Sequence, residues 1–527
     1  MRTFKRLAAA TIIAAILATG CGSAKPASQT QTQAPAAPQA AQTQKPASTV
    51  APTVEPAPVD VAAAQGKAKY VFLFIGDGMG YPQINTAEIL AKQISAPGTI
   101  GVERMEFTKF ENSGSVTTFD AESFCPDSAS TGTAMASGNK TLGGVINMDV
   151  TKTEKFTIIS ELAKDAGYKV GVISSVSLDH ATPACFYAKQ ASRGDYYDIG
   201  LQLVNSSFDF FGGGGFLQPK GKDGDKEDLI AIAKTNGFAV PETNDEIMAL
   251  SGDSGKVLAI SPVLADAQSL PYELDRIRNG VDSLSLAQYV QKGIDVLDNE
   301  DGFFLMTEGG KIDWACHAND AASAMYDTLS LNEAVQVAVD FAQKHPAETL
   351  VLVTGDHETG GLTIGFAATG YSTFFEKTLS QNMSFIEFDA TYVKSMRDNS
   401  ATFEDAMAEI SKVFGLVPPE SGDESNAGMT LTDGEYKKLQ DAYALSMIPS
   451  TDRNYDESQS ILYGTYEPLS VTCTHILNNK AGIGWTSYAH TGVPIPVFAY
   501  GEKAGIFGGS YDNTDIFKKL TKVMELL

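Results

Sequence analysis

The strongest constraint on the fold is an alternation of short apolar runs with stretches of helical spacing, which begins near Lys67 and continues toward the C-terminus. Five apolar runs have the length and composition of strands buried on both faces, and they cover residues 70–75, 169–174, 302–307, 349–354 and 495–500. Helical spacing covers residues 157–166, 285–297 and 329–343. This alternation predicts the α/β class, a doubly wound and mainly parallel sheet with helices on both faces, whose ligands gather beyond the carboxyl ends of the strands.

The alternation is interrupted at about residues 370–470. This stretch is polar and contains a Pro418-Pro419 pair, while residues 402–414 and 433–445 have helical spacing. We therefore expect an inserted helical and irregular segment beside the active site, within one domain that spans residues 67–527.

The N-terminal segment has the pattern of a secretory signal. Basic residues are followed by an apolar run at residues 7–17 and by small residues that end at Cys21. A cysteine in this position resembles the lipidation site of bacterial lipoproteins, so we expect residues 1–20 to be removed and Cys21 to carry the only membrane attachment. The expected location is extracytoplasmic, anchored to the bacterial cell membrane at the cell surface or in the periplasm.

The composition of the tether and the net charge of the chain indicate which parts fold and which partners are excluded. Residues 21–66 are rich in Ala, Pro, Gln, Thr and Ser, cannot bury enough apolar surface to fold, and are expected to form a flexible tether. The formal net charge is -25, so the chain repels polyanions and no nucleic-acid binding is expected.

Four cysteines besides the lipidation site are available for disulfides, and none is in a C-x-x-C pair that would indicate a thiolate zinc site: Cys125, Cys185, Cys316 and Cys473.

Carboxylates and histidines follow the predicted strands. Asp77 lies in a glycine-rich turn after the first strand, and Asp356 and His357 lie in a turn after the fourth. Such turns aim side chains at the open edge of the sheet, where adjacent Asp and His residues can converge on one ion.

A second group of candidate ligands follows the third strand. Asp313 and His317 are four residues apart, so on a helix they share one face and can bind one ion together. Glu308 precedes that turn and is a candidate ligand of a neighbouring ion, and His490 comes just before the last strand. Several such segments at strand ends together indicate a metal cluster.

Ser128 and Arg193 are the candidate catalytic residues. Ser128 is placed at the start of a small-residue helix, where backbone N–H groups and the helix dipole favour an anionic group on its oxygen. Arg193 offers a rigid fork for two oxygens of a phosphate. His180 and Thr182 are further polar candidates in the segment between these two residues.

Together, these six ordered segments resemble the alkaline phosphatase family from about residue 67 to residue 500. The resemblance implies two zinc ions and one magnesium ion. It places one zinc on Asp313, His317 and His490, a second on Asp77, Asp356 and His357 with Ser128 facing the substrate, and the magnesium on Asp77, Thr182 and Glu308. His180 and Trp314 replace an aspartate and a lysine of the best-known enterobacterial pattern, which makes His180 a further candidate ligand and leaves the identity of the third ion open.

The implied reaction is the hydrolysis of small-molecule phosphate monoesters to an alcohol and inorganic phosphate through a phosphoserine on Ser128, with Arg193 binding the transferred group. A phosphodiesterase, sulfatase or mutase of the same superfamily is the nearest alternative, although Arg193 favours a dianionic monoester. A phosphate-binding surface lipoprotein is an alternative from another class, but it leaves the candidate metal ligands without purpose. Members of the family are often dimers, so the resemblance is compatible with a homodimer.

Overall fold

The computed structural model describes residues 66–422, 426 and 428–527. The predicted signal, Cys21 and all but the last residue of the predicted tether lie outside the described residues, so these calls stay predictions. Every described residue belongs to the second of the chain's two units, Ala62–Leu527. Across the part of the chain that is described, no helix combines the length and the apolar character needed to cross a bilayer.

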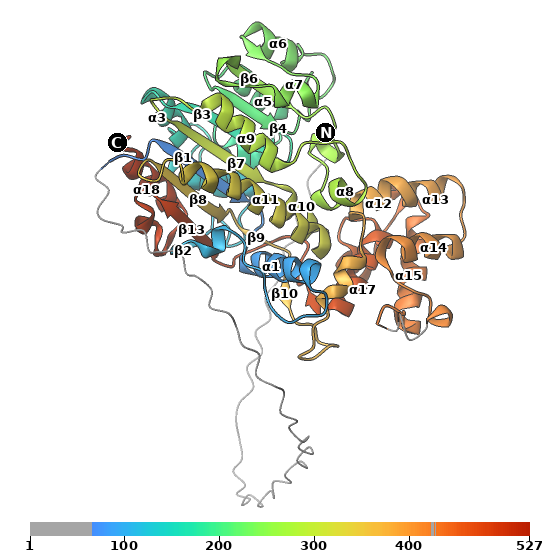
Figure 1. Ribbon diagram of the computed structural model, residues 1–527. Helices are drawn as coiled ribbons and strands as arrows, with labels where there is room; N and C mark the ends of the chain where they lie inside the picture. Colours follow the sequence, from blue (N-terminus) through green and yellow to red (C-terminus); the bar gives the residue numbers. More distant parts are fainter. Residues whose placement is uncertain (1–65, 423–425, 427) are drawn as a thin grey trace, which may run out of the picture. The chain divides into compact units, whose positions relative to one another are not determined.

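A ten-stranded sheet forms the centre of the second unit (Figure 1), in the order β14-β2-β13-β8-β1-β7-β3-β4-β6-β5. Its strands are β1 Tyr70–Gly76, β2 Asn112–Thr117, β3 Lys169–Ser174, β4 Phe210–Gly213, β5 Phe238–Ala239, β6 Lys256–Ile260, β7 Phe303–Gly309, β8 Thr349–Gly355, β13 Ile495–Gly501 and β14 Gly509–Asp512. Every pairing is parallel except those that β13 makes with β8 and β2. The predicted fold class, a mainly parallel α/β sheet, is confirmed.

Two small ladders complete the strands, one joining β9 and β12 and the other joining β10 and β11. They comprise β9 Glu358–Thr359, β10 Thr363–Ile364, β11 Ile483–Gly484 and β12 His490–Thr491. In the first ladder His490 pairs with Thr359, so the segment that carries His490 lies beside the turn that carries His357.

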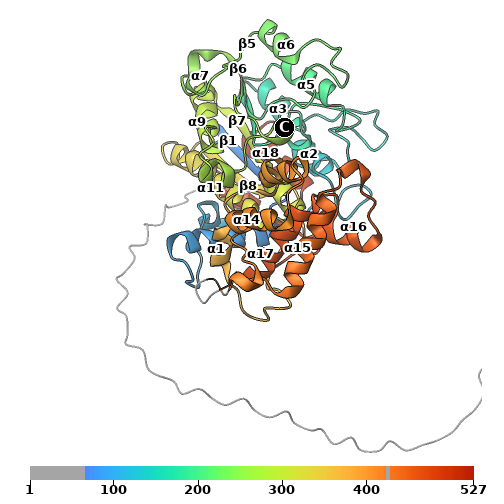
Figure 2. The same cartoon turned by 90° about the vertical axis from the view of Figure 1, so that its right-hand side faces the viewer.

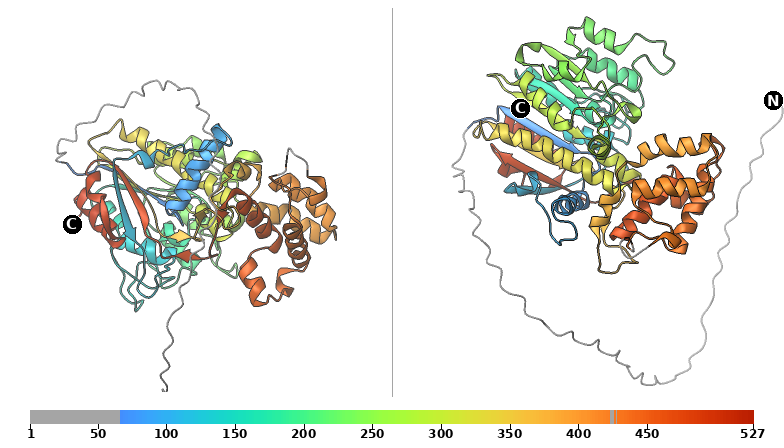
Figure 3. Two further views of the ribbon diagram at one scale, coloured as in Figure 1. Left: turned by 90° about the horizontal axis from the view of Figure 1, so that it is seen from below. Right: turned by 45° about the vertical axis from the view of Figure 1, so that its right-hand side comes forward.

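Helices cover both faces of the sheet (Figures 1 and 3). Those outside the predicted insertion are α1 Tyr81–Ser95, α2 Ser128–Ser137, α3 Ile159–Asp165, α4 Ala181–Ala184, α5 Tyr196–Val204, α6 Leu229–Thr235, α7 Asn244–Met248, α8 Glu273–Arg278, α9 Leu286–Leu297, α10 Lys311–His317, α11 Ala321–Ala342 and α18 Thr514–Met524. The side chains of β1 alternate between two cores: Phe72 and Phe74 belong to the core that packs against α1, α9 and α11, whereas Leu73 and Ile75 belong to the core beneath α2, α3 and α18. This alternation is the geometry expected of a strand with helices on both faces.

The predicted insertion folds as a group of helices with its own core (Figure 2). We define the helical insertion as residues 375–481, which contain α12 Phe385–Phe388, α13 Lys394–Asp398, α14 Phe403–Phe414, α15 Asp433–Ser446, α16 Glu457–Tyr463 and α17 Pro468–Ala481. Capping boxes begin α14 at Thr402 and α15 at Thr432, each with an acidic residue three positions later. The two helices predicted at residues 402–414 and 433–445 therefore form within one residue of their expected bounds.

The cysteines left open for disulfide formation are all free in this structure. Cys185 and Cys316 lie in the two cores on opposite faces of the sheet, Cys473 lies in the core of the helical insertion, and Cys125 is exposed. Because the four residues occupy four separate environments, the fold brings no two of them together, and the suggested pairing among them does not occur.

Candidate active site

Three adjacent strands end level with one another and carry the site. Gly76 of β1 pairs with Gly309 of β7 and with Gly355 of β8, so the residues that follow or adjoin these glycines emerge at one edge. Asp77, Glu308 and Asp356 are all fully buried there. Gly78 has a φ of +71°, and a Cβ at this position would lie 2.9 Å from the Asp313 Cα, so the turn requires glycine.

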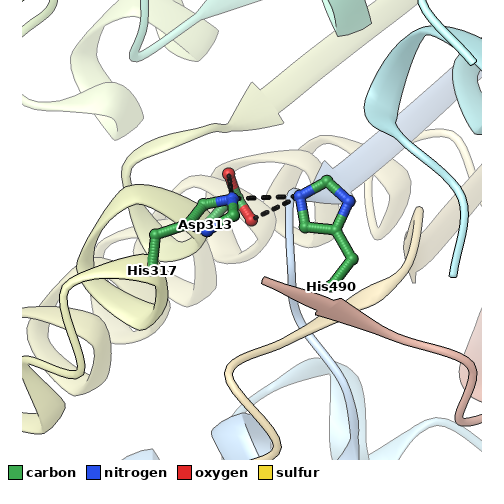
Figure 4. A group of neighbouring side chains, drawn as sticks. All are labelled: Asp313, His317 and His490. Carbon is green, nitrogen blue, oxygen red and sulfur yellow. Dashed lines mark hydrogen bonds and ion pairs between the residues drawn. The ribbon is translucent and has the colours of Figure 1, made fainter. Parts of the chain in front are cut away.

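Asp313, His317 and His490 form the first group of ligands (Figure 4). Asp313 Oδ2 lies 3.3 Å from His317 Nε2, and Asp313 Oδ1 lies 3.6 Å from His490 Nε2. The Nδ1 atoms donate to main-chain carbonyls, that of His317 to Tyr488 O at 2.5 Å and that of His490 to Pro126 O at 2.6 Å. A carbonyl only accepts, so each Nδ1 carries a proton, and in the neutral ring each Nε2 presents a lone pair.

The two Nε2 atoms lie only 3.0 Å apart. Two imidazole lone pairs at this distance repel each other unless a cation lies between them, and a carboxylate beside them adds a third donor of the kind that zinc binds. The donor set of the first group therefore fits a zinc ion.

The second group surrounds His357. Its Nε2 lies 3.4 Å from Asp77 Oδ1, 3.2 Å from Asp356 Oδ2 and 3.3 Å from Ser128 Oγ. Ligand atoms of Asp77, Asp313 and His357 also lie within 4.8 Å of one another, so Asp313 reaches both groups. Asp356, which the sequence assigned to this ion, also accepts hydrogen bonds from Gly78 N at 3.1 Å and Thr131 Oγ1 at 3.2 Å.

The third group comprises Asp77, His180 and Glu308. Thr182 Oγ1 lies 3.4 Å from Asp77 Oδ2, which places this predicted ligand at the same position. Ser174 donates a hydrogen bond to Glu308 Oε2. All nine residues predicted to bind metals thus lie in one cluster.

Three buried atoms of this cluster have no hydrogen-bond partner among the described residues: Asp77 Oδ1, His180 Nδ1 and Glu308 Oε1. Burial raises the pKa of Asp77 well above its ordinary value, and repulsion from Asp356 and Asp313 raises it further. Burial likewise raises the pKa of Glu308 to about 7. Bound cations stabilise buried carboxylates and unpartnered ligand atoms of this kind, so the three groups fit metal ions.

Ser128 is the first residue of α2 and is buried. The preceding residue, Asp127, caps the helix by accepting a hydrogen bond from Ser130 N at 3.0 Å, and its other oxygen forms an ion pair with Arg193 Nη1 at 2.9 Å. Burial alone would raise the pKa of Asp127, but the Arg193 charge and the hydrogen bonds to the carboxylate lower it. Asp127 therefore holds the Arg193 guanidinium at the start of α2 as an ion pair.

The sequence did not indicate how several further residues orient the ligands. Thr359 Oγ1 donates to Asp313 Oδ1 at 2.5 Å and lies 3.2 Å from His357 Nδ1. Trp314 packs edge-on against the His180 ring, with 5.6 Å between the ring centroids. Asp127 did have a signal in the sequence, because it directly precedes Ser128. The main-chain carbonyls that accept from His317 and His490 had none, since any residue type can supply a carbonyl.

Comparisons with known proteins agree with this geometry. The alkaline phosphatase family model matches residues 68–526. Alkaline phosphatase 3 of Bacillus subtilis (strain 168) is 30% identical over 473 residues, covering 88% of this chain and 90% of the relative. The cold-active alkaline phosphatase of the psychrophile Shewanella sp. has a TM-score of 0.70 at 28% identity, covering 86% of this chain and 99% of that one.

The alkaline phosphatase of Thermus thermophilus has a TM-score of 0.72 at 23% identity, covering 89% of this chain and 96% of that one, and it supports the fold alone. The family model, in contrast, spans nearly all of the described residues. This chain therefore belongs to the alkaline phosphatase family, and the reaction that it catalyses is the hydrolysis of phosphate monoesters.

Proposed function

We propose that this hydrolysis proceeds through a phosphoserine on Ser128, at a site that holds two zinc ions and one magnesium ion. The observation that carries the proposal is the position of the Ser128 hydroxyl. Its Oγ is buried at the first turn of α2 and lies 3.3 Å from His357 Nε2, inside the cluster of convergent carboxylates and imidazoles.

The zinc ions would be held by the first and second groups: Asp313, His317 and His490 for one ion, and Asp77, Asp356 and His357 for the other. Magnesium prefers oxygen ligands, which Asp77, Thr182 and Glu308 supply, and His180 adds a nitrogen to the same set. A solved variant of the Antarctic bacterium TAB5 alkaline phosphatase, in which a histidine is replaced by glutamate, has Mg bound in its M3 site. When bound, such ions stabilise charge that develops on a phosphoryl group and lower the pKa of a coordinated hydroxyl.

The reaction then consists of two displacements at phosphorus. Ser128 loses its hydroxyl proton, its Oγ forms a bond to phosphorus, and the bond from phosphorus to the alcohol oxygen breaks as the alcohol leaves with a proton. Water then attacks the phosphoserine, inorganic phosphate leaves, and Ser128 regains its proton. Throughout, Arg193 offers two parallel N–H donors to the phosphoryl oxygens, and Asp127 fixes its orientation.

Removal and return of metals test this proposal. We expect the chelated chain to release no phosphate from an aryl monoester, and we expect zinc followed by magnesium to restore the activity. His317→Ala should bind one zinc fewer than the unmodified chain and lose at least about 100-fold in kcat, because loss of a ligand costs more than loss of an outer-shell partner.

His345→Ala is the matched control. This histidine lies beyond the end of α11, and its side chain is 32% exposed and contacts none of the three groups. The control should keep the metal content and the activity of the unmodified chain. Full activity after chelation, with metal analysis showing no retained ions, would contradict the proposal.

We also propose that the chain acts outside the cytoplasm, attached to the membrane through lipid on Cys21, and that it forms a homodimer. The apolar run at residues 7–17 followed by small residues and Cys21 supports the anchor. Cys21→Ser should move the activity from the membrane fraction to the soluble fraction, and light scattering of the solubilised chain reports the assembly.

A further inference from the structure

Asn319 lies two residues after His317, directly beyond α10, and it is buried with a left-handed φ of +51°. Its Nδ2 donates to two carbonyls, Cys316 O and Ser487 O, each at 2.9 Å. Its Oδ1 can only accept, so His475 Nε2, at 3.0 Å, is the donor to it. The single amide of Asn319 therefore joins the end of α10 to two segments, at His475 and Ser487, that are distant from it in the sequence.

Two of the partners belong to α17, the last helix of the helical insertion. His475 donates to the Asn319 side chain, and Asn478 Nδ2 donates to the Asn319 main-chain oxygen at 2.7 Å. His475 belongs to none of the three groups of candidate metal ligands. Its hydrogen bond is a direct link between the insertion and the residues that follow His317.

The third segment is the one that leads into His490. Asn319 fixes it through Ser487 O, and the next carbonyl, Tyr488 O, accepts the hydrogen bond from His317 Nδ1 at 2.5 Å. The Tyr488 ring is also held by the insertion: its hydroxyl donates to Leu462 O, and its centroid lies 5.8 Å from that of Tyr466.

We infer that the helical insertion positions the two histidines of the first group, His317 and His490, by holding Asn319 and Tyr488. The inference rests on the proposed zinc site. Asn319, two residues after His317, is tied to the insertion through His475. Tyr488, whose carbonyl sets the tautomer of His317, is also tied to the insertion, and His490 follows it by two residues. Outer-shell partners of this kind orient ligands, and their loss typically weakens metal binding by about 10–100-fold.

Variants at two positions separate a positioning role from a general effect on folding. Asn319→Gly keeps the left-handed backbone and removes the amide, whereas His475→Leu removes the donor and keeps the bulk. His475→Gln restores an N–H donor. Asn382→Ala is the matched control, because the Asn382 Nδ2 also donates to a carbonyl within the insertion, Lys412 O at 2.9 Å, but has no link to Asn319.

The measurement is the zinc affinity of the full-length protein by competition with a chromophoric chelator, together with the visible absorption of the cobalt-substituted protein. We expect Asn319→Gly and His475→Leu to bind the zinc of the first group about 10–100-fold more weakly and to have an altered cobalt spectrum. His475→Gln and Asn382→Ala should match the unmodified protein in both readouts.

The inference is overturned if Asn319→Gly and His475→Leu keep the original zinc affinity and cobalt spectrum while His317→Ala loses one zinc. The first group would then bind its zinc without being positioned by the insertion. If His317→Ala loses no zinc, the proposed zinc site itself fails, and with it the basis of the inference. Should Asn319→Gly not fold, as judged by circular dichroism, the comparison of His475→Leu with His475→Gln decides alone: equal affinities overturn the inference.

Discussion

Arg193 owes its place at the start of α2 to its ion pair with Asp127, the residue before Ser128. One oxygen of Asp127 caps α2, and the other accepts from Arg193 Nη1 and from Gly144 N at 3.0 Å. The guanidinium therefore keeps a defined orientation at the start of the helix that carries Ser128. A planar guanidinium in a fixed orientation can bind two oxygens of one phosphoryl group. In a phosphate monoester these oxygens are free to accept both hydrogen bonds.

Replacement of Arg193 by lysine tests this geometry. Arg193→Lys keeps the charge but loses the second parallel hydrogen bond, so we expect kcat/KM for an aryl monoester to fall about 10–100-fold, which is about 1.4–2.7 kcal/mol. The same substitution at Arg104, whose side chain is 62% exposed, should leave kcat/KM unchanged. An unaltered kcat/KM in Arg193→Lys would show that a point charge suffices.

At the same scale, the sequence indicated the chemistry of the side chains but not their connections. Asp77, Glu308 and His357 could be predicted as candidate ligands that lie together because each follows or ends a continuous apolar strand. The reach of Asp313 into two groups could not be predicted, because it depends on where α10 begins relative to the neighbouring turn. Carbonyl acceptors such as Tyr488 O depend on backbone position alone.

At the scale of elements, strand prediction succeeded where a run is long and apolar. β1, β7 and β8 each have seven buried residues, and all were predicted within two residues of their bounds. β2 was missed because its sequence is polar and its residues are partly exposed, and β5 because it has only two residues. Short or polar strands form because the neighbouring strand supplies hydrogen bonds, which local periodicity does not record.

The helical insertion is fastened to the rest of the unit by a buried carboxylate on α8. Asp275 accepts hydrogen bonds from Ser384 N at 2.8 Å and Ser384 Oγ at 2.6 Å, and Ser384 is the N-cap of α12. Burial raises the pKa of Asp275 to about 6, and the negative charges of Glu387 and Asp320 act in the same direction, against the hydrogen bonds from Ser384.

This shift predicts a pH-dependent stability. A carboxyl group whose pKa is about 6 when folded and about 3.9 when unfolded binds its proton more tightly in the folded state, so its contribution to stability is lost as the pH rises from about 4 to 6. Asp275→Asn has no such proton. Its free energy of unfolding, relative to that of the unmodified protein, should therefore increase by up to about 3 kcal/mol between pH 4 and pH 7.

Urea denaturation at several pH values and constant metal concentration measures this difference. Asp398→Asn, at an exposed position where the carboxylate pairs with Lys394, controls for the substitution itself. A difference between Asp275→Asn and the unmodified protein that stays constant with pH would contradict the assigned pKa.

At the scale of the whole molecule, the sheet and the insertion have separate tasks. The level ends of β1, β7 and β8 gather the carboxylates, while the insertion reaches the site through contacts such as those of Asn319 and Tyr488. The sequence predicted both the sheet and the inserted segment, because apolar runs and their interruption are local properties. It could not predict that the insertion contacts the ligand-bearing segments, since such contacts join residues that are distant along the chain.

We infer that phosphate passes through a covalent bond to Ser128. The most direct measurement is mass spectrometry of the protein quenched in acid during turnover of an aryl monoester, with Ser128→Ala and Ser137→Ala treated in the same way. We predict phosphate on the peptide that contains Ser128 in the unmodified protein and in Ser137→Ala, where the substitution lies at the far end of the same helix, and none in Ser128→Ala. Undiminished turnover by Ser128→Ala, or phosphate on another residue, would contradict a phosphoserine intermediate on Ser128.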